Sequence, residues 1–302
     1  MTVSELLASS QDVSNSSLQA ACRLCLRRDR TSSVISSPVR KLMKCKGCGV
    51  TYLEPQPQAE MISEHLAERY ITLDEQVEIN FGRLREAVMS RVAARIQERK
   101  GRGRILDVGC AGGYFLHRYF SASGWDLHGV EPSRFAARVA ENKGLRIFQG
   151  ELRDVVLPAT HFDVVTIFDT LSYFREPQIE LGVIRRAMRP DALLVVEQPI
   201  SSTHIWRHNT IFGRLLGGAP MSLLENGQNF LYDPRSMRHL FRQTGFHADD
   251  FETLPGNKQR DLLRDLLFGG YFLLSRFVWH LSGRNEILGP NFVVFASLSN
   301  NY

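Results

Sequence analysis

The sequence predicts an α/β protein in which a doubly wound, mostly parallel sheet of seven strands follows a small cysteine-rich module. Two observations predict this architecture. From residue 104 onwards, short apolar runs alternate with segments of helical spacing, as in sheets covered by helices on both faces. Before that point, four of the five cysteines form two Cys-x-x-Cys pairs. The 302 residues are 43% apolar and 23% charged, which excludes collagen, coiled-coil and wholly disordered classes.

The two cysteine pairs, Cys22/Cys25 and Cys45/Cys48, are separated by nineteen residues. Two such pairs at this separation match a tetrahedral zinc site, in which each pair occupies one edge of the tetrahedron. With four protein ligands, the Zn²⁺ would be structural. Disulfides or a redox dithiol are the alternatives. Zinc is favoured because the sequence gives no sign of export and neither pair has a strand–helix context.

We divide the chain into a disordered tail (1–20), a zinc-binding module (21–58) and an α/β domain (59–302). An insertion at 256–288 separates the last two strands of that domain. The first twenty residues are rich in Ser, Gln and Asn and lack the basic and apolar regions of a secretory signal. Residues 54–58, with alternating prolines, end the module as a short stiff linker.

The net charge of +5 is concentrated in the module. Between Cys22 and Cys48 there are eight Lys or Arg and one Asp, a local +7, so the rest of the chain sums to −2. One interpretation is contact with a phosphate-bearing partner. The other is that these cations offset the thiolates and keep a small module soluble. The basic residues are Arg23, Arg27, Arg28, Arg30, Arg40, Lys41, Lys44 and Lys46.

The α/β domain is predicted to begin with helix at 59–100, where apolar residues recur at helix-face spacing and Gly101 and Gly103 end the pattern. Strands and helices then alternate, which predicts parallel strands joined by helical crossovers. The predicted strands are 104–108, 127–130, 145–148, 162–168, 193–196, 246–251 and 292–296, and the predicted helices are 114–121, 133–142 and 178–188.

A glycine-rich loop, residues 109–113, follows the first strand of this pattern. Its glycines allow a sharp turn and a close approach to a ligand. The loop lacks the glycines of a dinucleotide fingerprint and the Gly-Lys-Ser/Thr of a phosphate-binding loop, which favours a small ligand without pyrophosphate. Glu131 ends the next strand, eighteen positions after Gly113, where a carboxylate can accept both hydroxyls of a ribose.

Together these stretches resemble the class I S-adenosylmethionine (SAM)-dependent methyltransferases, over roughly residues 66–298. The resemblance implies a Rossmann-like fold and SAM as cofactor. It is carried by residues 106–113, 129–132, 162–169 and 188–197.

The resemblance also implies roles for individual residues. Asp107 and the loop would hold the amino-acid portion of SAM, and Glu131 its ribose. Glu151 and Leu152 would contact the adenine, while Phe168 and Asp169 would form the floor beneath the methyl donor. The loop residues are Gly109, Cys110, Ala111, Gly112 and Gly113.

The order of zinc-ribbon-like module, helix and methyltransferase domain is similar to a branch that methylates sugars, polysaccharides and natural products. That branch often has Glu-His where this chain has Ser172-Tyr173, and often His where Asn229 stands. Familiar general bases are thus absent. His204, just beyond the fifth strand, and Tyr173 are our candidate catalytic residues. The alternative is that both are loop residues that pack or face solvent.

The segment 261–281 is apolar with a cationic rim. Core packing or a dimer surface explains this composition, and a lid that makes peripheral membrane contact with a lipid-linked substrate is the alternative. Its polar interruptions exclude a membrane-spanning helix. A cytoplasmic location is therefore expected.

We expect a methyltransferase that acts on a small or carrier-linked metabolite, by O- or C-methylation of a sugar or natural product. One alternative is an RNA or DNA methyltransferase that grips nucleic acid with the basic zinc module. It is less favoured because no Phe, Tyr or Trp lies between Cys22 and Gly49 to stack on bases. The other is a non-catalytic cofactor-binding scaffold, suggested by the altered residues at 172–173 and 229.

Overall fold

The structure is a computed structural model that describes residues 21–28, 30–57, 85–211, 227–253, 274–275, 277–283, 289 and 291–299. The expected tail, the predicted helix as far as residue 84 and most of the 256–288 insertion lie outside the described residues. Within the described part, no helix is both long enough and apolar enough to cross a bilayer.

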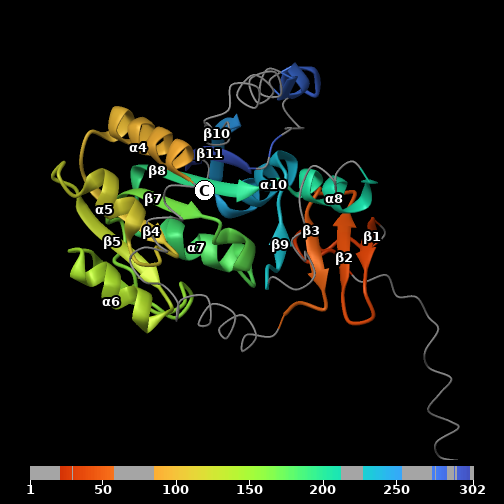
Figure 1. Ribbon diagram of the computed structural model, residues 1–302, viewed down its shortest axis with the longest axis horizontal. Helices are drawn as coiled ribbons and strands as arrows, with labels where there is room; N and C mark the ends of the chain where they lie inside the picture. Colours follow the sequence, from red (N-terminus) through yellow and green to blue (C-terminus); the bar gives the residue numbers. More distant parts are fainter. Residues whose placement is uncertain are drawn as a thin grey trace, which may run out of the picture.

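A seven-stranded sheet forms the larger part of the molecule (Figure 1), with strand order β10-β11-β8-β7-β4-β5-β6. All pairs from β8 to β6 are parallel, and β11 runs antiparallel to both of its neighbours. The strands are β4 (Arg104–Val108), β5 (Asp126–Glu131), β6 (Arg146–Gln149), β7 (Phe162–Phe168), β8 (Met188–Pro199), β10 (Phe246–Thr253) and β11 (Asn291–Leu298).

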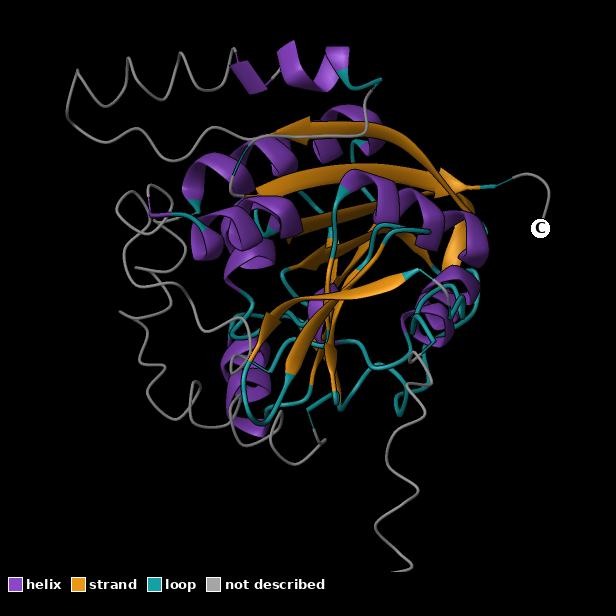
Figure 2. Cartoon of the chain, turned by 90° about the vertical axis from the view of Figure 1, so that its right-hand side faces the viewer, coloured by secondary structure: helices purple, strands orange, loops and turns teal. Residues whose placement is uncertain are grey.

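Helices cover both faces of this sheet (Figure 2). One apolar cluster joins α4 and α5 to one face, and another joins α7 and α10 to the other. This confirms the doubly wound α/β prediction. The helices are α4 (Glu86–Lys100), α5 (Tyr114–Phe120), α6 (Arg134–Asn142), α7 (Pro177–Ala187), α8 (Ser201–Asn209) and α10 (Pro234–Thr244), and a 3₁₀ turn, η1 (Leu171–Tyr173), follows β7.

The predicted strands are confirmed, those at 104–108 and 162–168 with the same bounds. The predicted helix at 178–188 ends one residue early, because β8 begins at Met188. The sequence analysis did not predict α8 or α10. Helix α10 starts at a capping box, in which Asp233 and Ser236 each accept a backbone N–H of the other residue.

The module forms a second sheet, of order β1-β2-β3-β9, from β1 (Thr31–Ser36), β2 (Lys41–Cys45), β3 (Thr51–Glu54) and β9 (Phe230–Leu231). None of these strands was predicted. The fourth comes from the far end of the α/β domain, with Thr51 opposite Leu231. The two parts therefore share main-chain pairing, and the apolar cluster that contains α7 and α10 also includes module residues such as Leu24 and Tyr52.

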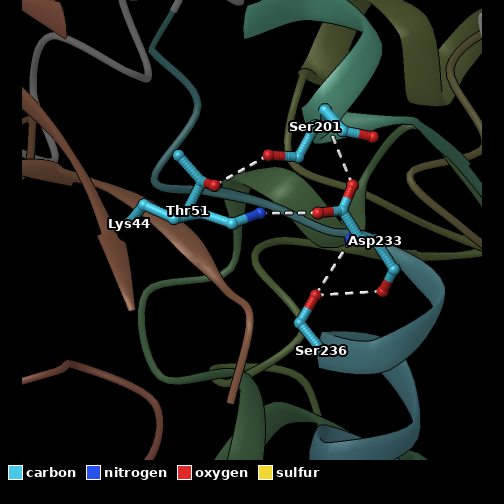
Figure 3. Close-up of polar contacts among 6 residues, drawn as sticks. Lys44, Thr51, Ser201, Asp233 and Ser236 are labelled. Carbon is cyan, nitrogen blue, oxygen red and sulfur yellow. Dashed lines mark hydrogen bonds and ion pairs between the residues drawn. The ribbon is translucent and has the colours of Figure 1, made fainter. Parts of the chain in front are cut away.

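Polar contacts reinforce this junction (Figure 3). Lys44 of β2 donates to the Asp233 carboxylate over 2.6 Å, and Ser201 at the start of α8 donates to Thr51 over 2.7 Å. Asp233 also accepts the Ser202 backbone N–H. The buried Asp233 carboxylate thus caps α10, accepts a backbone N–H from the first turn of α8 and pairs with Lys44 of the module.

Candidate functional site

The glycine-rich loop follows β4 at the carboxyl edge of the sheet. The strand order reverses at β4, because β5 and β6 lie on one side of it and β7 and β8 lie on the other. Ligands of open α/β sheets bind at such a point. The N–H groups of Gly109 and Cys110 donate to the Val130 carbonyl, so the loop is closed against β5. Gly109 has φ +75°, and a Cβ there would lie 2.2 Å from Thr170 Oγ1. A side chain at Gly109 would therefore clash with the turn after β7.

Glu131 ends β5 and is 1% exposed. Its carboxylate accepts the N–H of Ala111 over 2.9 Å and that of Ser133 over 2.8 Å, which joins the glycine loop to the start of α6. Burial raises the pKa of Glu131 to about 7, although the two N–H donors act to lower the pKa. Each carboxylate oxygen retains a lone pair that can accept a hydrogen bond from a hydroxyl. The predicted contact with a ribose is therefore compatible with this geometry.

Arg85, directly before α4, lies among carboxylates from neighbouring strands. Its guanidinium pairs with Asp169 over 2.7 Å and also with Glu197, while Asn291 donates to the other oxygen of Glu197. Asp107 adds its charge to the same surroundings. We call Arg85, Asp107, Asp169, Glu197 and Asn291 the edge cluster. They come from the residue that precedes α4 and from four adjacent strands or their ends.

The edge cluster is acidic, and two of its three carboxylates are buried. Asp107 is 4% exposed and accepts the Thr166 hydroxyl over 2.7 Å, and Glu197 is fully buried. Burial raises the pKa of Asp107 to about 7, with Thr166 and Arg85 opposing the shift. Burial also raises the pKa of Glu197 to about 7, and the neighbouring Asp169 adds to this effect. Three carboxylates face one guanidinium, so with all of them ionised the cluster carries −2 and favours a cationic ligand.

Asp169 shows a further sign of a ligand site. It has φ +55°, which strains a non-glycine residue, and its Oδ1 is buried without a hydrogen-bond partner. Its other oxygen pairs with Arg85. Beside it, the half-buried Phe168 packs against Phe115 with ring centroids 4.6 Å apart. Both predicted floor residues therefore lie at the carboxyl edge, Asp169 within the edge cluster and Phe168 beside it.

The other predicted cofactor residues divide into two groups. Leu152 is buried in the core, while Glu151 is exposed beside Arg153. Cys110 is buried, and its sulfur would lie 2.4 Å from a Cβ on Gly129. Its side chain is thus a packing group under β5. Within the loop, its sulfur also donates to the Ala111 carbonyl over 3.6 Å.

The candidate catalytic residues are not brought together by any described contact. Tyr173 lies half-buried in η1, and its carbonyl accepts the side chain of Asn229 over 2.8 Å. The backbone N–H of Asn229 donates to Ser172, and its carbonyl accepts from Leu53 of β3. Asn229 therefore fastens the turn after β7 to the module. His204 belongs to α8, and its side chain lies outside the described part of the structure.

The four module cysteines form one cluster, in which all four sulfur atoms lie within 4.8 Å of one another. None is in a disulfide, and the Cys22–Cys48 and Cys25–Cys45 sulfur pairs are both 3.7 Å apart. Zn–S bonds of about 2.3 Å in a tetrahedron place sulfurs about 3.8 Å apart. A disulfide requires about 2.05 Å. The donor set thus fits a tetrahedral thiophilic ion.

Sequence reasoning missed Arg85 and Asn291. Arg85 is one of several arginines in its segment, and nothing in the local pattern distinguishes it. Asn291 opens a strand that runs antiparallel to β8, so its first residues meet the last residues of β8. The antiparallel direction of the last strand would have been the only available signal.

Comparison with known proteins identifies the family. A methyltransferase domain matches residues 79–250, more than half of the chain. The chain belongs to the methyltransferase-domain family. Residues 79–250 include the glycine loop, Glu131 and every member of the edge cluster except Asn291.

Two curated proteins match part of the chain. It is 32% identical over 117 residues to the mitochondrial ubiquinone biosynthesis O-methyltransferase of Schizosaccharomyces pombe, covering 36% of this chain and 42% of that protein. It is 30% identical over 91 residues to the uncharacterized methyltransferase YdaC of Bacillus subtilis, covering 28% and 50%. The chain thus spans half or less of the curated relatives it matches.

Solved structures share the fold. The 1,6-didemethyltoxoflavin-N1-methyltransferase of Burkholderia thailandensis aligns with a TM-score of 0.52 and 14% identity, covering 88% of this chain and 98% of that one. A SAM-dependent methyltransferase from Thermotoga maritima aligns with a TM-score of 0.51 and 15% identity, covering 77% and 98%. At these identities the likeness concerns the fold alone.

SAM, the donor that this family implies, fits the residues present. It carries two positive charges and one carboxylate, a net +1, and the edge cluster is acidic. The glycine loop gives the close approach that the amino-acid portion requires, and Asp169 has an unpartnered oxygen. Asp107, Glu131 and the loop are the residues that would hold it.

Proposed function

We propose that this methyltransferase uses SAM to methylate an oxygen or carbon atom of a small or carrier-linked metabolite, of the sugar or natural-product class. When bound, SAM supplies a methyl group on a sulfonium, which the acceptor atom displaces in line. The observation that carries the proposal is Asp169. Its strained, half-exposed carboxylate has one unpartnered oxygen at the edge where the acceptor and donor must meet.

The chain's own residues would hold the reactants in place. Arg85 anchors Asp169 and Glu197 in one arrangement, so the carboxylates need little reorganisation when a cation enters. Asn229 holds the 171–174 turn against the module, which keeps Tyr173 at the rim. Alignment of this kind supplies most of the rate in methyl transfer from an activated donor.

A small acceptor is also supported by the relatives. The fission-yeast relative is named for O-methylation in ubiquinone biosynthesis, and the Burkholderia structure contains bound 1,6-didemethyltoxoflavin and S-adenosylhomocysteine. We extend a small acceptor from these proteins to this chain. Tyr173 and His204 remain our candidates for the general base. His204→Asn and Tyr173→Phe each test this assignment, because loss of a base lowers kcat and removes a limb of its pH profile.

We further propose that Cys22, Cys25, Cys45 and Cys48 bind one structural Zn²⁺. The sulfur separations support this assignment. A closed four-thiolate site has no position open for substrate, so the ion would stabilise the module rather than take part in transfer. Because β9 of the larger domain completes the module's sheet, loss of the ion would also loosen the turn held by Asn229.

The acceptor is tested with isotopically methyl-labelled SAM. The purified chain is incubated with a metabolite extract and, separately, with total RNA, and the labelled products are identified by mass spectrometry. The proposal expects label in a small molecule. Label only in RNA, or no label despite SAM binding, would overturn it.

Glu131→Ala provides the site control for that assay. It should weaken SAM binding by about 1–3 kcal/mol, because charged hydrogen bonds to the ribose are lost. The matched variant Glu141→Ala removes an exposed carboxylate of α6 and should leave the affinity unchanged. Equal affinities for the two variants would mean that the ribose lies elsewhere.

A further inference from the structure

A cationic surface forms where the cysteine module meets α10. We call it the knuckle patch and define it by Arg27, Lys46, Arg235, His239 and Arg242. We call each Cys-x-x-Cys pair with its turn a knuckle. Arg27 follows the first knuckle and Lys46 lies within the second, while the other three residues recur along α10. All four Lys and Arg side chains of the patch are exposed. The basic face predicted from the sequence contains only module residues, and α10 extends it.

Direct contacts hold the two halves of the patch together. Arg235 donates to the Gly47 carbonyl over 2.8 Å, which fixes α10 against the second knuckle. Arg27 Cδ lies 3.5 Å from the Cβ position of Gly47. His239 lies close to these cations. Burial lowers the pKa of His239, and the positive charges of Arg242, Arg27 and Arg235 lower it further. The patch is therefore one surface and not a set of scattered charges.

The cations of the patch differ from the other basic residues of the module. Arg23 pairs with Glu54 over 2.9 Å, and Lys44 pairs with Asp233. Among the described residues, no carboxylate pairs with Arg27, Lys46, Arg235 or Arg242. The patch therefore presents cations that no described carboxylate neutralises.

A groove of about 920 Å³ lies next to the patch, because its lining includes Leu26 and Gln243, the chain neighbours of Arg27 and Arg242. It contains exposed apolar side chains. It is lined on one side by the first knuckle, including Leu26, and on the other by the start of α7, including Ile179. Leu26 is 76% exposed and Ile179 is 56% exposed. The knuckle turn fixes Leu26 outward, because its N–H donates to the Cys22 carbonyl and φ is +60°.

This combination favours a protein over a nucleic acid as the partner. Along the groove Glu54 pairs with Arg23 and Glu176 pairs with Arg153, so the groove itself offers apolar side chains and paired charges, not a continuous track of cations for a phosphate backbone. The patch contains no Phe, Tyr or Trp, and its single ring, His239, is half-buried, whereas single-stranded nucleic acids are bound by stacking on aromatic side chains. Arginines beside an exposed leucine and isoleucine are typical of protein–protein contacts.

We propose that the knuckle patch and the adjoining groove form a docking surface for an acidic protein partner, one that presents carboxylates beside apolar side chains. The groove reaches Arg153, next to the predicted adenine turn, and Glu176, just after the 171–174 turn. If the proposed function holds, a partner docked here can deliver a tethered acceptor to the rim of the site.

The test uses the full chain with its metal and no methyl donor, so the outcome does not depend on the proposed function. The probe is a fluorescein-labelled acidic amphipathic helical peptide with leucines at i and i+4, followed by fluorescence anisotropy. The comparison probes are the same peptide with the leucines replaced by glutamine, a single-stranded RNA, and phosphatidylserine vesicles.

Three variants decide the result. Arg27→Glu/Arg242→Glu should weaken peptide binding by about tenfold or more at low salt, and Leu26→Ser should weaken it by about threefold. Arg138→Glu/Arg186→Glu, which changes the net charge equally on exposed residues of α6 and α7, should change it by less than about twofold. Metal content and melting temperature verify folding, and Lys46→Glu/Arg242→Glu replaces the first variant if that variant unfolds.

Tighter binding of the RNA or of the vesicles than of the peptide would overturn the proposal in favour of those partners. Equal effects of the two double charge reversals would also overturn it, because the peptide would then sense only net charge. If neither Leu26→Ser nor the glutamine peptide weakens binding, the apolar half of the surface is not used and the assignment to a protein partner is wrong.

Discussion

Gly109→Ala tests the close approach between the glycine loop and the turn after β7. Gly109 has φ +75°, which costs an alanine about 1–2 kcal/mol. The new Cβ would also lie 2.2 Å from Thr170 Oγ1 and 2.7 Å from Thr170 Cγ2. Relieving such an overlap in a packed region costs a further 1–3 kcal/mol, roughly. The total destabilisation should be about 2–5 kcal/mol, with weaker SAM binding in addition.

Two variants separate these contributions. Gly124→Ala has a similar φ of +71° and no atom within 4 Å of the new Cβ, so it should show only the backbone cost. Gly109→Ala/Thr170→Ala removes the two overlapping atoms, although it loses the bond from Thr170 to the Phe168 carbonyl. The double variant should recover about 1–3 kcal/mol relative to the sum of the single variants.

Urea denaturation measures the free energies of unfolding, and calorimetry measures SAM binding. The reasoning is refuted if Gly109→Ala is no less stable than Gly124→Ala, or if Thr170→Ala recovers nothing. Either result would mean that the loop does not lie against Thr170 as the structure places it.

Three further predictions concern the module junction, the metal and the pH dependence. Lys44→Met should destabilise the fold by about 1–3 kcal/mol, because it leaves the buried Asp233 carboxylate without its cation. Urea denaturation measures this loss, with Lys44→Arg as the control. Equal stability of the Met variant and the wild type would contradict the prediction. Chelation, or Cys48→Ser, should remove about one zinc per chain by elemental analysis and lower the melting temperature, whereas purified protein without metal would exclude the zinc assignment. SAM affinity measured by calorimetry should rise between about pH 6 and 8, because burial raises the pKa of Glu131 to about 7 and a cationic donor favours the ionised form. S-adenosylhomocysteine, which lacks the sulfonium charge, should show a smaller rise.

The same carboxylates set the pH dependence of the ligand-free fold. The folded pKa of Glu131, about 7, lies above its ordinary value of 4.5, so the folded state holds the proton more tightly than the unfolded state. The stability that Glu131 contributes through this tighter proton binding is therefore fully present below pH 4.5 and is lost as the pH rises through 7. Asp107 and Glu197 act in the same direction. Thermal unfolding should show a melting temperature that falls over this interval without SAM and falls less with it.

What could be predicted from the sequence is what short stretches encode locally. The strands at 104–108 and 162–168 were predicted to the residue, because a buried parallel strand is a continuous apolar run with polar ends. The cysteine cluster followed from spacing alone, because each Cys-x-x-Cys turn already brings two sulfurs to one point. Glu131 and the glycine loop were found for the same reason, since each lies directly at a strand end.

Only the tertiary structure decided how distant segments complete the site. Arg85 meets Asp169 and Glu197 because α4 packs with its first turn over the carboxyl edge, and no local pattern reports that packing. β9 joins the module's sheet although more than 170 residues separate it from β3. Such pairings depend on which surfaces remain unpaired once the core has formed, and this is a property of the whole chain. For that reason the type of fold and the glycine-rich loop could be predicted from the sequence, whereas the way in which the edge cluster and the knuckle patch are assembled could not.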